Sequence, residues 1–433
     1  MGCALLPEAS VPKAVDEVLR TLQGAGHPTY LVGGSVRDLL RGVEPKDFDL
    51  ATAARPEQVQ ACFRRVLPTG LQHGTVTVLL GGEQVEVTTF RTEGLYLDGR
   101  RPSQVSFRDD VRDDLARRDF TINAMAYDPV THTLVDPFGG RDDLEARVVR
   151  CVGVPAERFG EDGLRVMRAV RIATVMDFNV EPETEAAIGG ALPVFNRIAL
   201  ERVTEELRKL LLSPHVARGL LLLRRTGLTA TILPGLVDGQ AIDDAVARIP
   251  PVLEARLAVW LGLGTGAARA PDLEASPVDT ALTPRTALDR LKLSRKEEAS
   301  ILRLVEALSL ATRAEAGDGA LRRILARFPE DELPLVAAVA QAATPVLGLS
   351  MDDALRVSER LHALHDAHPP LNPRALALDG GAIMRALAVK PSPLVGEATR
   401  YLMEQVFDDP SLNTAESLTE LLRDFAARAQ GEG

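Results

Sequence analysis

The sequence changes character at about Val149, and this change constrains the fold more than any other feature. Before it, strand patterns at residues 28–34 ("PTYLVGG") and 47–53 ("DFDLATA") flank a helical pattern at residues 35–42 ("SVRDLLRG"). After it, Leu, Ala, Arg and Glu recur with helical spacing and the strand signals stop. The sequence therefore predicts an α+β protein, with a small mixed-sheet head followed by an all-helical remainder.

Composition narrows the kinds of partner that the chain can bind. Its 433 residues carry a formal net charge of −11, which excludes a uniformly basic nucleic-acid binder but leaves room for local basic faces. The three cysteines are scattered, without the spacing of a disulfide framework or a zinc site, so we expect a reducing, cytoplasmic location. No run of about 18 apolar residues occurs, and we expect no membrane partner.

Two aspartates stand one residue apart at the start of the second predicted strand. Alternate residues of a strand point to the same face, so Asp47 and Asp49 would lie together and repel unless a cation lay between them. Mg²⁺ prefers carboxylate and phosphate oxygens, and two such ions can hold the attacking and leaving oxygens of a phosphoryl transfer. For an isolated pair of this kind, a turn cap beside a solvated side chain is the more common arrangement.

A third carboxylate belongs to a predicted β-hairpin. Residues 74–80 ("GTVTVLL") and 83–90 ("EQVEVTTF") are two strand patterns separated by a Gly-containing turn. Glu86 would either point towards Asp47 and Asp49 as a further metal ligand or point outward as an ordinary strand residue. Strand register decides between these arrangements, and the sequence leaves both open.

A glycine pair precedes these carboxylates. Gly33 and Gly34 allow the backbone to approach a ligand closely, and the helix that follows directs unpaired N–H groups at an anion. Arg37, one turn into that helix, can add a guanidinium to the same phosphate. Alone, such a pair is usually a tight turn, but next to Asp47 and Asp49 it predicts a site for a triphosphate and a metal.

Three segments carry a resemblance to a known family: "GGSVRD" (33–38), "DFDL" (47–50) and "RRDFTINAMA" (117–126). With them the chain resembles the polymerase β-type nucleotidyltransferases. More narrowly, it is similar to the class II tRNA nucleotidyltransferases, that is, the bacterial CCA-adding enzymes and their poly(A) polymerase relatives. The resemblance runs almost continuously over residues 30–212 and returns at residues 380–402.

The resemblance implies a fold and a reaction. A catalytic nucleotidyltransferase head (1–147) would precede a helical neck (148–215), body (216–345) and tail (346–433). The head would transfer NMP from CTP or ATP to the 3′ end of tRNA, using Mg²⁺ and no nucleic-acid template. Arginine-rich helical surfaces would hold the tRNA by its phosphates. Both a monomer and a homodimer remain open.

The segment "EDGLRVMRAVR" (161–171) would select the base. Its spacing predicts one helix with the charged side chains on one face, for which a solvated stripe of salt bridges is the usual outcome. The resemblance instead implies that Asp162 and Arg165 read the incoming nucleotide. An acidic acceptor beside an arginine donor fits the exocyclic amine and ring nitrogen of cytosine and adenine and opposes uracil and guanine. The other nucleotide contacts that the resemblance implies are Arg118, Asp119, Asn123, Arg168 and Arg171.

Residues 90–107 ("FRTEGLYLDGRRPSQVSF") are polar, arginine-rich and contain glycine, and they predict a mobile loop. The segment resembles the loop that separates family members able to add the terminal A from those that stop after CC, so we expect A addition. Addition of all of CCA and addition of A alone remain open, as does poly(A) polymerase activity on general RNA 3′ ends. A catalytically decayed RNA-binding protein is the alternative from a different class.

Overall fold

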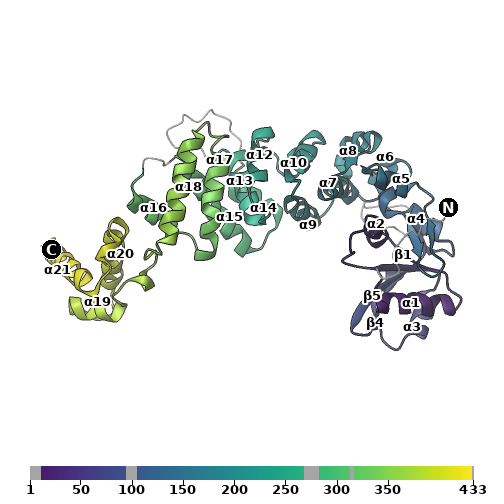
Figure 1. Cartoon of the computed structure of the whole chain (residues 1–433), viewed down its shortest axis with the longest axis horizontal. Coiled ribbons are helices and arrows are strands. Elements are labelled where there is room, and N and C mark those ends of the chain that lie inside the picture. Colours follow the sequence, from purple (N-terminus) through teal and green to yellow (C-terminus); the bar gives the residue numbers. More distant parts are fainter. Residues whose placement is uncertain (1–10, 94–104, 268–281, 313–315, 432–433) are drawn as a thin grey trace. The chain divides into compact units, whose positions relative to one another are not determined.

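A seven-stranded mixed sheet forms the centre of the N-terminal region (Figure 1). The computed structural model describes residues 11–93, 105–267, 282–312 and 316–431. The strand order is β3-β4-β5-β2-β1-β8-β9, in which β2 and β5 run parallel and the other neighbours run antiparallel. The strands of this sheet are β1 (Thr29–Val32), β2 (Asp49–Thr52), β3 (Val66–Gly70), β4 (Thr75–Leu80), β5 (Glu83–Thr89), β8 (Ala126–Asp128) and β9 (Thr133–Val135).

The predicted hairpin is present as β4 and β5. The chain turns at Gly81 and Gly82, whose φ angles of 60° and 88° lie in the left-handed region that favours glycine. A separate two-stranded pair, β6 (Arg91–Glu93) and β7 (Val105–Phe107), lies within the predicted loop of residues 90–107, so the prediction of a loop is wrong at both ends of this range. Residues 94–104 of that loop lie outside the described part of the chain.

Helices α1 and α3 pack on the sheet beside β4 (Figure 1). The apolar residues of α1 (Lys13–Gly24) recur at helical spacing, so that Val15, Val18 and Leu22 form one buried face. α3 (Pro56–Cys62) begins with a proline at its first turn, where the missing N–H costs nothing. Each buried apolar side chain of this kind contributes about 2 kcal/mol to folding.

The rest of the region up to Ile232 is helical, with one exception that the sequence did not predict. β10 (Val148–Val149) and β11 (Asn179–Val180) form a short parallel pair, so the expectation that strands end at about Val149 is wrong at one point. Two residues are too few to show an alternating pattern. The other helices here are α2 (Gly34–Leu40), α4 (Val111–Ala116), α5 (Gly140–Glu145), α6 (Pro155–Glu161), α7 (Leu164–Met176), α8 (Pro182–Phe195), α9 (Leu200–Leu211), α10 (Val216–Arg225) and α11 (Leu228–Ile232).

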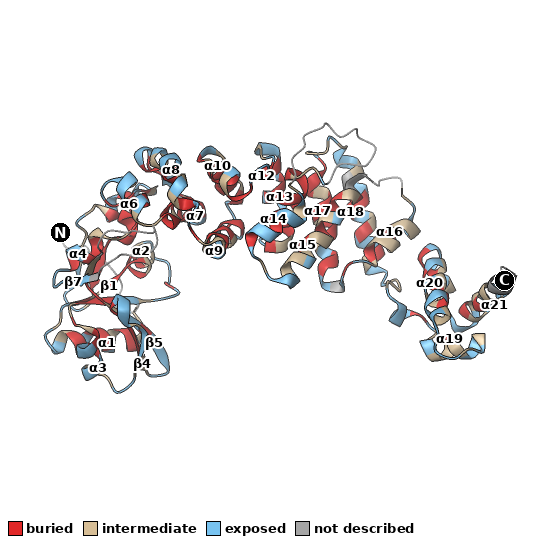
Figure 2. Ribbon diagram, turned by 180° about the vertical axis from the view of Figure 1, so that it is seen from behind, coloured by how far each residue is buried: buried red, intermediate tan, exposed pale blue. Residues whose placement is uncertain are grey.

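The chain divides into two compact units, Met1–Ile232 and Leu233–Gly433. The second unit contains α13 (Leu253–Gly264), which is buried almost throughout its length and is drawn mainly in red in Figure 2. Its other described helices are α12 (Gln240–Arg248), α14 (Pro284–Leu291), α15 (Arg295–Ala307), α16 (Asp318–Leu325), α17 (Leu333–Ala343), α18 (Met351–Asp366), α19 (Gly380–Leu387), α20 (Pro393–Asp408) and α21 (Ala415–Gly431).

This architecture confirms the predicted α+β class, a mixed sheet with helices followed by helices alone. The four-part division into head, neck, body and tail stays a prediction. None of the helices in the described ranges has the length and apolar character needed to cross a membrane.

Candidate active site

Two carboxylates, those of Asp49 and Glu86, lie where the parallel strands β2 and β5 run side by side, and that of Asp47 lies nearby. The register sets Asp49 directly beside Glu86, which decides the orientation that the sequence left open. β2 begins at Asp49, so Asp47 lies in the segment before the strand and not in the strand itself. Within the described residues, none of these three carboxylates accepts a hydrogen bond or forms an ion pair.

The carboxyl groups of Asp49 and Glu86 both have pKa values above the ordinary range. Partial loss of hydration is the main cause in each case. Negative neighbours add to it, since Asp47 raises the pKa of Asp49 and Asp49 raises that of Glu86, while the Arg118 charge opposes the shift at Asp49. Like charges held this close favour a bound cation.

The carboxylate group fits a hard divalent cation. Among the described residues, no three His, Cys, Asp or Glu side chains are close enough to form a complete metal cluster by themselves. Mg²⁺ is usually bound by one or two carboxylates, with substrate phosphates and water completing its coordination. The donor set here therefore suits a cation that arrives with a nucleotide.

A cavity of about 370 Å³ is lined by residues of β2 and β5 and by residues of later segments of the chain. The cavity brings together carboxylates and arginines that the sequence placed in separate segments. The predicted residues that line it are Asp49, Glu86, Arg118, Asp119, Asp162, Arg165 and Arg168. The predicted residues outside its lining are Gly33, Gly34, Arg37, Asp47, Asn123 and Arg171.

Arg118 connects the glycine pair to the cavity. Gly33 has a φ of 73°, and a Cβ atom there would lie 2.9 Å from Arg118 Nη1, so a side chain at this position would displace the guanidinium. The Nε of Arg118 is buried and finds no hydrogen-bond acceptor in the described part of the chain. A buried N–H group of this kind is unfavourable until a ligand accepts from it.

A chain of hydrogen bonds runs from α2 to α7 through Asp119. Arg168 donates to Asp119 Oδ2 from Nε at 2.8 Å and from Nη2 at 2.5 Å, and Asn123 Nδ2 donates to Asp119 Oδ1 at 3.1 Å. Asn123 Oδ1 accepts from Arg37 Nη1 at 2.7 Å, and Arg37 also pairs with Asp38. Arg37 and Asn123 thus lie behind the cavity, where they hold the side chains that line it.

Replacing Asp119 by Asn should lower the free energy of unfolding by about 2 kcal/mol at pH 7, because Arg168 loses its counter-charge. The loss stays below that of a fully buried pair because the Arg168 side chain is 35% exposed. Burial would raise the pKa of Asp119, but the Arg168 charge and the hydrogen bonds from Asn123 and Arg168 hold it well below its usual range. The lowered pKa stabilises the fold above about pH 4, and this stability is lost as the pH falls towards the folded-state pKa.

Urea unfolding of both proteins at pH 7, 4 and 3 measures this effect. The variant should show a flatter dependence of unfolding free energy on pH than the unmodified protein. Equal slopes in the two proteins would contradict the assignment of this stability to Asp119.

The predicted single helix over residues 161–171 is wrong. α6 ends at Glu161 and α7 begins at Leu164. Gly163, between them, packs so closely that a Cβ atom would lie 2.8 Å from the backbone nitrogen of Phe195. Tertiary packing, which the spacing of the arginines does not report, therefore sets the break between the helices.

Asp162 and Arg165 line the cavity without bonding to each other through their side chains. Asp162 Oδ2 accepts from Arg202 Nη2 at 3.3 Å. Arg165 donates from Nη1 to Glu161 and from Nη2 to the Arg117 carbonyl oxygen, the latter at 2.8 Å. The two side chains that the resemblance assigns to base selection are therefore each held by a different partner.

Arg202 is a cavity residue that the sequence reasoning did not single out. It lies in the first turn of α9, and its Nη1 is buried without a hydrogen-bond partner in the described ranges. Its segment is an ordinary amphipathic helix, so no sequence signal marks it. Arg171, for which a nucleotide contact stays a prediction, donates to Glu206 Oε2 at 2.7 Å and so joins α7 to α9.

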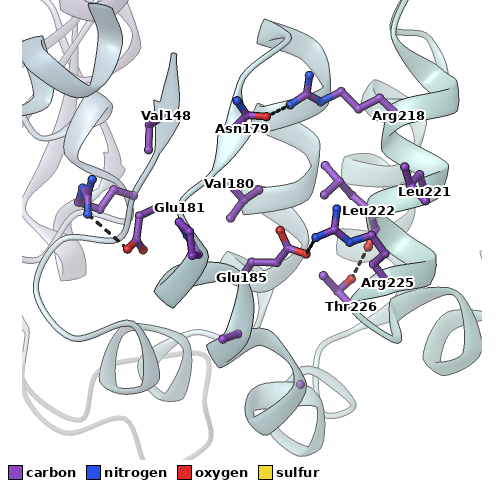
Figure 3. Close-up of a pocket in the computed structure, with 14 residues that line it drawn as sticks. Val148, Asn179, Val180, Glu181, Glu185, Arg218, Leu221, Leu222, Arg225 and Thr226 are labelled. Carbon is purple, nitrogen blue, oxygen red and sulfur yellow. Dashed lines mark hydrogen bonds and ion pairs between the residues drawn. The ribbon is translucent and has the colours of Figure 1, made fainter. Parts of the chain in front are cut away.

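A second cavity, of about 960 Å³, lies among α8, α10 and the β10–β11 pair (Figure 3). Its charged side chains are already paired: Arg225 lies 2.7 Å from Glu185, and Arg218 Nη2 donates to Asn179 Oδ1 at 2.5 Å. The unpaired carboxylates lie at the first cavity, and we take that cavity as the candidate active site.

Two protein families match segments of the chain. The family of poly A polymerase head domains matches residues 29–150, which contain the mixed sheet and the carboxylates. The family described as a probable RNA and SrmB-binding site of polymerase A matches residues 177–239.

Proteins similar over the full length share one name. The chain is 33% identical over 417 residues to the CCA-adding enzyme of Streptococcus suis, with 94% of this chain and 95% of that protein covered. It is 34% identical over 420 residues to the CCA-adding enzyme of Lactiplantibacillus plantarum, with 95% and 96% covered.

A solved structure agrees with these relatives. The Bacillus stearothermophilus CCA-adding enzyme in complex with CTP is 31% identical, with a TM-score of 0.77 over 98% of this chain and 100% of that one. These findings confirm the resemblance seen in the sequence, and the chain belongs to the CCA-adding enzymes, a family of nucleotidyltransferases.

Proposed function

We propose that this protein adds CMP and AMP from CTP and ATP to the 3′ end of tRNA, with Mg²⁺ as its metal. The observation that supports this proposal is one cavity in which unpaired carboxylates lie together with Asp162, Arg165 and Arg202. Family membership supplies the class of reaction, and the relative whose structure contains CTP supports the choice of nucleotide.

The carboxylates of the central strands β2 and β5, with nearby arginines, would bind the phosphates and the cation. Asp49 and Glu86, with Asp47 beside them, would hold the cation, whose charge stabilises the oxygens of the transferred phosphoryl group when it is bound. Arg118 and Arg168 bring positive charge to the same cavity. Their guanidinium groups would bind and orient the triphosphate.

The helices would select the base. Asp162 would accept a hydrogen bond from the exocyclic amine that cytosine and adenine share, and Arg165 would donate to the neighbouring ring nitrogen. The unpartnered Nη1 of Arg202 offers a second donor on the same wall. Uracil and guanine present a carbonyl in place of the amine, which would face the Asp162 carboxylate.

Poly(A) polymerase activity is the second candidate, because the matched head family bears that name. It would use ATP alone and accept any RNA 3′ end. A decayed RNA-binding protein fits less well, since the carboxylates and the unpartnered Arg118 Nε would then carry an unfavourable arrangement with no ligand to stabilise it.

Incorporation of labelled NMP into three tRNA transcripts tests the proposal. The transcripts end at the discriminator base, after one C and after CC, and each is incubated with Mg²⁺ and CTP, ATP or both. Ordered use of both nucleotides identifies addition of all of CCA, whereas ATP use on the CC-ended transcript alone identifies an A-adding enzyme. Extension of an unrelated RNA at a similar rate would replace the proposal with poly(A) polymerase activity.

The remaining expectations belong to the same proposal. The protein would be cytoplasmic and either a monomer or a homodimer. It would consist of a catalytic head (1–147), a neck (148–215) that recognises the base, and a body (216–345) and tail (346–433) that bind tRNA. The two helical parts after the neck would hold tRNA by its phosphates, so binding should weaken steeply with salt.

A further inference from the structure

Asp114 is a fully buried carboxylate next to the candidate active site. It lies in α4 and has 0% of its surface exposed, and it does not line the cavity itself. Burying a charge of this kind is strongly unfavourable unless partners compensate it. The groups that bond to Asp114 therefore show which side chains its charge positions.

Donors from three residues surround this carboxylate. Arg117 donates to Oδ1 from Nε at 2.9 Å and from Nη2 at 2.8 Å. Arg118 Nη2 donates to Oδ2 at 3.2 Å, and the backbone N–H of Arg91 donates to Oδ1 at 3.4 Å. Burial would raise the pKa of Asp114, but the two guanidinium charges and their hydrogen bonds hold it below its usual range, so the group is an anion at neutral pH.

For the side chain of Arg118, Asp114 is the one hydrogen-bond and ion-pair partner that the described residues provide. The other edges of the guanidinium point elsewhere: Nη1 lies against Gly33, and Nε is buried without an acceptor. Of the three guanidinium nitrogens, Nη2 is thus bonded to Asp114, and Arg118 lines the cavity. A guanidinium held at one nitrogen keeps its plane and its direction.

We propose that Asp114 is a positioning residue that orients Arg118 for binding the nucleotide. This inference rests on the proposed function, since it assigns Arg118 to the nucleotide. Without the Asp114 anion, the long side chain of Arg118 loses its anchor and can turn towards the unpaired carboxylates Asp49 and Glu86. The positive charge would then neutralise the metal ligands and would no longer face the substrate.

Asp114 is also connected indirectly, through Arg117, to Arg165, one of the two residues proposed to select the base. Arg117, its other partner, accepts a hydrogen bond from Arg165 Nη2 at its carbonyl oxygen. An effect through this route would change the preference among nucleotides, whereas an effect through Arg118 would weaken all nucleotides alike. The two routes therefore leave different signatures.

The test is a double-mutant cycle of Asp114→Asn and Arg118→Ala, because such cycles isolate the interaction of two residues. The readouts are CTP and ATP affinity by titration, kcat/KM for each nucleotide, and the melting temperature. D114N alone should weaken both nucleotides by about tenfold, the effect of losing roughly 1.4 kcal/mol. In the R118A background the same change should cost less than about twofold.

Asp243→Asn is the matched control, because Asp243 is also 0% exposed but lies in α12 of the second unit. It should leave nucleotide affinity unchanged even if the melting temperature falls. Additive losses in the double variant would overturn the proposal, as would a loss in D114N that follows the melting temperature alone or that alters the preference for CTP over UTP.

Two further measurements keep the outcome decisive. If D114N does not fold, Asp114→Glu, which keeps the charge but moves it, replaces it in the same cycle. If the unmodified protein binds CTP but transfers no NMP, the proposed function fails while the affinity cycle still decides the role of Asp114.

Discussion

Asp49→Ala should lower the rate of NMP transfer by at least about 1,000-fold. A cation at this site contributes several kcal/mol to stabilising the reacting oxygens, and each 1.36 kcal/mol changes the rate tenfold. Asp49 stands beside Glu86 in the register of β2 and β5, and its carboxylate has no hydrogen-bond or ion-pair partner in the described ranges. Single-turnover incorporation of CMP and AMP measures the loss, with tRNA affinity determined in parallel and expected to stay unchanged.

The same variant should not be less stable than the unmodified protein. The raised pKa of Asp49 means that its charged form is disfavoured in the fold, so the stabilising contribution exists only at low pH and is lost as the pH rises through that pKa. Removing the charge should therefore leave the melting temperature at pH 7 unchanged or higher. Glu83→Ala, at the exposed start of β5, is the control and should transfer NMP normally. Activity in Asp49→Ala within tenfold of normal would refute the metal assignment.

Asp162→Ala should reduce the preference for CTP over UTP by about 100-fold, the effect of about 2.7 kcal/mol. In the proposed arrangement the carboxylate accepts from the amine of cytosine and repels the carbonyl of uracil, so the variant loses both the attraction and the rejection. Removing it also frees Arg202, whose Nη2 bonds to Asp162, to donate to a carbonyl in its place. The ratio of kcat/KM for CTP, ATP, UTP and GTP measures the change.

A uniform fall in rate for all four nucleotides, with their order preserved, would contradict the base-reading role of Asp162. The control is Glu157→Ala, an exposed carboxylate of α6 outside the cavity, which should leave both rates and order unchanged. Because Asp162 also caps Leu164 N at 3.0 Å, the melting temperature of the variant should be recorded with the kinetics.

Local patterns predicted the strands β1, β2, β4 and β5 of the sheet, but they did not predict β3, β8 and β9. The turn at Gly81 and Gly82 located the hairpin, and the glycine pair before α2 ended β1 as expected. The break at Gly163 was missed because its cause is the backbone of Phe195, more than thirty residues further along the chain. A pattern of spacing within eleven residues contains no information about such a contact.

The sequence named charged residues that line the candidate site, but it did not predict how their side chains pair. Glu86 needed the register of β5 against β2, and Arg202 and Asp114 needed to be seen next to the side chains that they hold. Each of these facts depends on segments that meet only in the folded chain. Sequence motifs therefore predict which residues take part, and the structure shows which of these side chains contact one another.

The hydrogen bonds that run from Arg37 through Asn123 and Asp119 to Arg168 have a consequence for protein engineering. Consider a chimera that joins the head of one relative to the helices of another at about residue 150. The residues of this hydrogen-bond network would then come from two different parents. Unless both parents carry compatible partners, the recombined protein would bury an unmatched charge. A crossover placed after Met176, at the end of α7, would take all residues of the hydrogen-bond network from one parent. It should give a higher yield of folded hybrids than a crossover at residue 150.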